Sequence, residues 1–92
     1  MDKKKFEEAK KIDRDLKEVE SQLSKTKILL YDISSSHDDK MGARLWPKDM
    51  SFGEHEGTII TVDRRLTVEL LNGMVKKLTI DKEKLERQFE EL

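Results

Sequence analysis

The hydrophobic pattern is most regular between residues 9 and 33, where apolar side chains recur at alternating intervals of three and four. This spacing is a heptad repeat, which places the side chains in one stripe along an α-helix. No Gly or Pro occurs in residues 3–33, so we expect one helix there, about 45 Å long. The stripe consists of Ala9, Ile12, Leu16, Val19, Leu23, Thr26, Leu30 and Ile33.

This stripe predicts a coiled-coil helix that packs on a second helix. A rod of about 45 Å exceeds the width of a 92-residue domain, so we expect its eight stripe residues to form the interface of a homo-oligomer. An antiparallel arrangement is favoured because it brings Asp13 near Lys27 of a second copy, which indicates a dimer or a tetramer. The alternative is that the helix lies on the remainder of its own chain.

Residues 34–57 connect this helix to the rest of the chain without clear periodicity. Such long connections are uncommon in compact domains. This one carries the only Trp and the only Pro, Trp46 and Pro47, so we expect a structured loop that folds back on the helix. A short helical turn is expected around residues 40–45.

Four residues are candidates for binding a small molecule. Arg44 can pair with a planar anion such as a nucleotide, and Trp46 can stack on it. Arg64 and Arg65 add positive charge in the following segment. The alternative for Trp46 is that it fills the gap between helix and sheet.

The C-terminal third reads as a small sheet followed by a helix. Residues 58–62 are β-branched and predict a strand, and Asn72-Gly73 is a strong signal for a hairpin turn. We therefore expect a three-stranded antiparallel meander over 58–80 and a short helix over 81–92. A competing interpretation makes residues 63–78 an amphipathic helix with Asp63 as its N-cap, a pattern that Leu66, Leu70, Met74, Lys77 and Leu78 also suit.

The predicted fold class is α+β in a single domain, residues 1–92. Charged residues make up 42% of the chain and hydrophobic ones 35%, which leaves little material for a deep monomeric core and again favours association. The net charge of −1 does not favour binding to nucleic acid or to an anionic membrane. No cysteine and no long apolar segment occur, so a cytoplasmic protein is expected.

No motif of a known catalytic site occurs in the sequence. His37 and His55 have acidic neighbours, but their spacing matches no zinc motif, so we expect no metal site, no cofactor and no enzymatic activity. Metal-dependent hydrolysis by these two histidine clusters is the remaining enzymatic hypothesis.

These patterns favour a small oligomeric binding protein that acts by occupying a partner protein. Small charged proteins of this kind also occur among the accessory factors of phages and mobile elements. The alternative is a multimeric protein that binds or sequesters a nucleotide-like small molecule, with its site at a subunit boundary.

Overall fold

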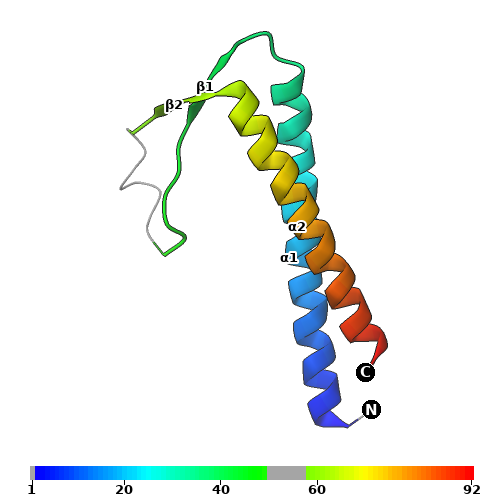
Figure 1. Cartoon of the computed structure of the whole chain (residues 1–92). Coiled ribbons are helices and arrows are strands. Elements are labelled where there is room, and N and C mark those ends of the chain that lie inside the picture. The colour runs from blue at the N-terminus through cyan, green and yellow to red at the C-terminus, as the bar shows by residue number, and fades with distance from the viewer. Residues whose placement is uncertain (1, 50–57) are drawn as a thin grey trace.

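Two long helices lie side by side and antiparallel, with a two-stranded arm at one end of the pair and both chain termini at the other (Figure 1). The computed structural model describes residues 2–49 and 58–92. The elements follow the order α1 (Lys3–Ser34), β1 (Lys40–Ala43), β2 (Ile60–Asp63) and α2 (Arg64–Glu90). This arrangement confirms the α+β class.

The N-terminal helix α1 matches its prediction closely. It begins at Lys3, where the carboxylate of Asp2 accepts a hydrogen bond of 2.8 Å from the backbone N–H of Lys5. Such a cap satisfies a donor that has no partner inside the helix. The helix ends at Ser34, within the serine run. Thirty-two residues give it a length of about 48 Å.

The arm is an antiparallel pair formed by β1 and β2. In its register, Met41 lies opposite Val62 and Ala43 opposite Ile60. The helical turn expected around residues 40–45 is therefore wrong, whereas the strand expected at 58–62 is confirmed in part, as β2. A Cβ at Gly42 would lie 3.2 Å from a methyl carbon of Ile59, so glycine permits this close approach.

The helix α2 replaces most of the predicted meander. Residues 64–90 are helical, so the strands expected on either side of Asn72-Gly73 are wrong, and so is a helix that begins only at residue 81. The competing interpretation is confirmed. The carboxylate of Asp63 accepts hydrogen bonds from the backbone N–H groups of Arg65, at 2.8 Å, and Leu66, at 3.3 Å.

The core lies between the two helices and is small. Among the described residues, Leu23 of α1 and Leu71 of α2 are the most buried hydrophobic side chains, with 8% and 6% exposed. Thr26 is also buried, and its hydroxyl donates a hydrogen bond of 2.7 Å to the carbonyl oxygen of Gln22. Lys82 of α2 pairs with Glu20 of α1 at 3.9 Å across the edge of the contact.

Candidate functional site

The arm presents large apolar side chains to solvent. Leu45 is 76% exposed, Ile59 is 58% exposed and Ile60 is 49% exposed. Trp46, which follows Leu45, is 40% exposed. We call these four residues the arm surface. Exposed apolar side chains that gather on one part of a surface are candidates for contact with a partner.

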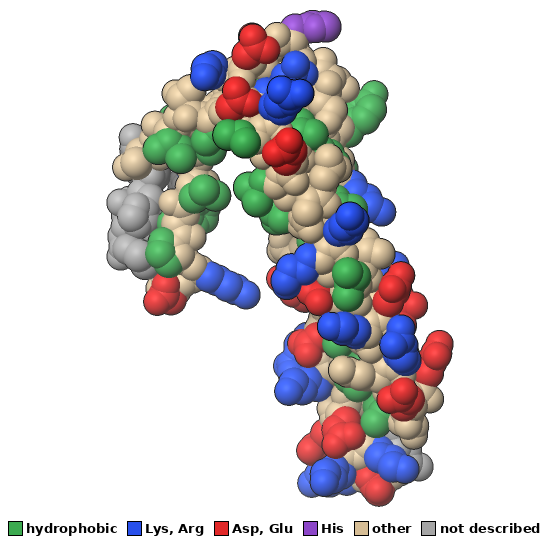
Figure 2. Space-filling model, in the orientation of Figure 1, with side chains coloured by type: hydrophobic (Ala, Val, Ile, Leu, Met, Phe, Trp, Pro, Cys, Tyr) green, Lys and Arg blue, Asp and Glu red, His purple; other side chains and the backbone are tan. Residues whose placement is uncertain are grey.

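The arm surface borders an open hollow. The arm descends beside the helix pair, and hydrophobic side chains lie on both sides of the space between them (Figure 2). Leu45 shares the parity of Met41 and Ala43, which are less exposed than their neighbours on β1. Alternate residues of a strand point to the same face. Leu45 lies two residues beyond the end of β1 and is more exposed than either Met41 or Ala43.

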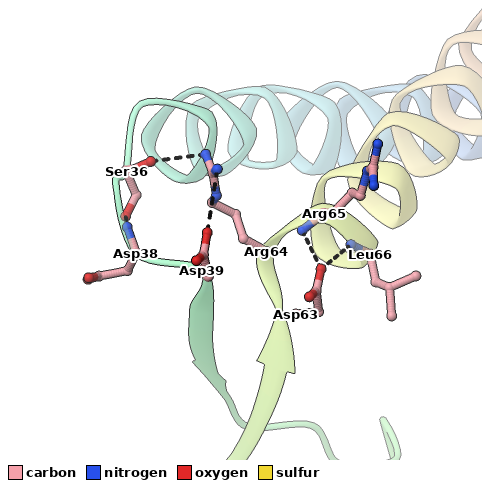
Figure 3. A network of polar contacts seen from close by, with 7 residues as sticks. All are labelled: Ser36, Asp38, Asp39, Asp63, Arg64, Arg65 and Leu66. Atoms are coloured by element: carbon pink, nitrogen blue, oxygen red, sulfur yellow. Dashed lines mark hydrogen bonds and ion pairs between the residues drawn. The ribbon is translucent and has the colours of Figure 1, made fainter.

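A polar junction fixes the arm to the helices. The guanidinium of Arg64 donates a hydrogen bond of 3.0 Å to the carbonyl oxygen of Ser36 and lies 4.0 Å from the carboxylate of Asp39 (Figure 3). The backbone N–H of Arg64 also donates to the carbonyl oxygen of Asp39 at 2.8 Å. Arg64, the first residue of α2, thus ties the start of that helix to the segment that follows α1.

The junction also borders a surface depression of about 550 Å³. Arg64 and Arg65 line it, together with the carboxylates of Asp39, Asp63 and Glu69. The N-terminus of a helix attracts anions through its unpaired N–H groups, but here the carboxylate of Asp63 already accepts from two of them. A nucleotide-like anion would have to compete with these carboxylates, which weakens the support for a small-molecule site.

The four predicted ligand residues fall into two groups. Arg64 and Arg65 lie together at the start of α2 (Figure 3). Arg44 and Trp46 follow β1, whose first residue, Lys40, pairs with Asp63. They therefore lie about 13–20 Å farther along the arm. Trp46 belongs to the arm surface, and 40% of it is exposed.

The heptad stripe has a neighbouring helix within its own chain. All eight positions are buried or half-buried, whereas every other residue of α1 except Asp15 is exposed. The helix beside them is α2 (Figure 1). Their predicted role as an interface between copies stays a prediction. Ile12, Leu16 and Val19 remain partly exposed because one neighbouring helix covers only part of the stripe.

A second apolar face lies on α2, as the competing helical interpretation of the sequence implied. Leu66, Leu70 and Met74 are 65%, 61% and 40% exposed. The signal was their spacing of four residues, which places them along one side of a helix. As members of a meander, they would have alternated between the faces of a sheet, so the face became visible only with the helical interpretation.

The candidate metal ligands are not brought together in the described ranges. His37 is exposed on the segment after α1, whereas His55 and its acidic neighbours lie outside the described residues. Across residues 2–49 and 58–92, no group of three His, Asp or Glu side chains could hold a metal ion. Within the same ranges, neither helix contains the length of apolar sequence that crossing a membrane requires.

No protein-family model, curated protein or solved structure matches this chain. A functional inference must therefore come from the chemistry of the chain's own surfaces.

Proposed function

We propose that this chain is a small oligomeric interaction protein that acts by occupying a partner protein through the arm surface. The observation that carries the proposal is the exposure of Leu45, Trp46, Ile59 and Ile60 on an element that projects from the helix pair. The hydrogen bonds of Arg64 to Ser36 and Asp39, at the base of the arm, hold this element in place.

The arm gains stability when it binds a partner. A two-stranded hairpin is marginally stable alone and exposes backbone edges as well as side chains. Burying the apolar side chains of the arm against a partner stabilises the complex by about 25 cal/mol per Å² of apolar area. An apolar segment of another protein fits this requirement. A cytoplasmic location belongs to the same proposal, since the cysteine-free chain needs no oxidising compartment.

Site-specific photocrosslinking tests the proposal. A benzophenone amino acid is introduced at Leu45 and, as a matched control, at Ile28, which is 62% exposed on α1. We expect a crosslinked partner protein that depends on the Leu45 position. The identified partner is then purified, and its affinity is measured by calorimetry for wild type and Leu45→Asp.

Leu45→Asp should weaken this affinity by about tenfold or more, because a carboxylate would be desolvated in an apolar contact. Ile28→Asp should leave the affinity unchanged. Equal crosslinking from both positions, or equal affinities of wild type and Leu45→Asp, would overturn the proposal.

A further inference from the structure

The exposed side chains of α2 form a continuous ridge. Leu66, Leu70 and Met74 follow one another at intervals of one turn, and the adjacent Leu71 is buried toward α1. The ridge therefore runs along the flank of α2: Met74 lies about 60° around the helix from Leu71, Leu70 about 100° and Leu66 about 140°.

A glycine beside this ridge has no explanation within the chain. Gly73 lies in the middle of α2, where glycine costs about 1 kcal/mol relative to alanine. Its φ is not positive, and a Cβ placed on it meets nothing within 4 Å. Alanine would fit without strain. Gly73 lines a surface depression together with Glu69, Asn72 and Lys76.

We infer that a second copy of this chain docks on this face, α2 against α2 in antiparallel orientation, about a two-fold axis between residues 71 and 72. Residues whose numbers sum to about 143 then lie opposite one another. Leu70 of each copy faces Gly73 of the other, so a large side chain enters the depression that glycine leaves. Close approach of two backbones is a common reason for glycine at a helix surface.

The charges next to the ridge support the antiparallel orientation. It brings Glu69 of each copy within reach of Lys76 of the other, which gives two opposite-charge pairs. A parallel two-fold pair would place these residues of the two copies on opposite sides of the contact, so it would form neither pair. The aliphatic part of Lys77 lies over Leu66 in the antiparallel arrangement, so it covers apolar surface while its ammonium group stays in water.

The chain as a whole exposes more surface than a compact monomer of its mass. A compact monomer of 10.8 kDa exposes about 5,500 Å². This chain exposes 7589 Å², about 2,000 Å² more. A stable interface of standard size buries about 800 Å² on each partner. This face is self-complementary, because it carries a ridge, a depression and charges of both signs. A second copy of the chain is therefore the partner that fits it.

Molar mass in solution tests this inference. The inference rests on the proposed function, because the dimer would be the oligomer of that proposal. Size exclusion with light scattering should give about 22 kDa for wild type, twice the 10.8 kDa of one chain. Leu70→Asp should give the monomer mass. Ile28→Asp, an equally drastic change on α1, should keep the dimer.

Gly73→Ala separates contact from folding. Alanine strengthens the helix, so a position without a contact role would gain stability at unchanged mass. We expect the opposite for the dimer: its dissociation constant should rise about tenfold or more, while far-ultraviolet circular dichroism shows an intact helix.

Monomeric wild type, or dimers that persist in both Leu70→Asp and Gly73→Ala, would overturn the inference. The crosslink from Leu45 to a partner protein is read separately. A monomeric wild type that still crosslinks a partner from Leu45 would therefore overturn the dimer and leave the proposed function standing.

Discussion

Arg64 shows how one side chain can determine where an element points. Its guanidinium holds Ser36, its backbone N–H holds the carbonyl oxygen of Asp39, and it is the first residue of α2. A guanidinium has five donors in a rigid plane, so it can hold two acceptors from one segment at once. The direction of the arm therefore depends on a residue that lies outside the arm itself.

Arg64→Ala should lower the free energy of unfolding by about 1 kcal/mol, because a part-buried charge-assisted hydrogen bond to Ser36 is lost. Urea denaturation measures this change, and hydrogen exchange should become faster at residues 36–41. Arg65→Ala is the matched control, since the side chain of Arg65 is exposed and points away from the junction (Figure 3). Equal effects of the two substitutions would contradict this role of Arg64.

The candidate ligand residues show the limit of residue-level prediction. Arg64 and Arg65 are neighbours in sequence, so their proximity at the depression could be anticipated. The separation of Arg44 and Trp46 from them depends on the pairing of Lys40 with Asp63, which no local pattern specifies. The capping role of Asp63 was part of the competing helical interpretation, and it decides the electrostatics of the depression.

At the scale of elements, the long helix was predictable and the hairpin was misplaced. Heptad spacing over 25 residues leaves little ambiguity, and α1 has the expected bounds within one residue. Asn72-Gly73 favours a hairpin turn only if both residues adopt positive φ, and no described residue does so. Tertiary packing overrode this local preference, because only a helix brings Leu71 against α1.

Leu71→Ala tests the packing of the two helices. The substitution should lower the free energy of unfolding by about 2–3 kcal/mol, since it removes one of the most buried side chains and leaves a cavity. Ile28→Ala, at a position that is 62% exposed, should change it by less than about 0.5 kcal/mol. Chemical denaturation at one fixed protein concentration gives both values. A similar cost for the two variants would mean that the contact between α1 and α2 contributes little.

The whole molecule is long and thin for its size. Its extents are 54 × 29 × 14 Å, and the radius of gyration of the Cα atoms is 17.2 Å. A compact chain of 92 residues has about 12 Å. This shape explains why so few side chains are buried, because a pair of helices encloses little volume. The sequence anticipated this consequence through its charged fraction of 42%.

Small-angle X-ray scattering measures this shape directly. The Leu70→Asp variant should give a radius of gyration near 17 Å, since the helix pair persists when the second copy is removed. A value near 12 Å would instead indicate that the chain collapses into a compact domain.

The neighbouring positions of the two chain ends have a mechanical consequence (Figure 1). Tension applied between the termini peels α2 from α1 turn by turn, so only the contacts at the opening fork resist it at any moment. Tension applied between the arm and both termini runs along the two helix axes, so the backbone hydrogen bonds of each helix bear it and the contacts between the helices are not peeled apart. The helix pair should thus open at a low force in the first direction and withstand a higher force in the second.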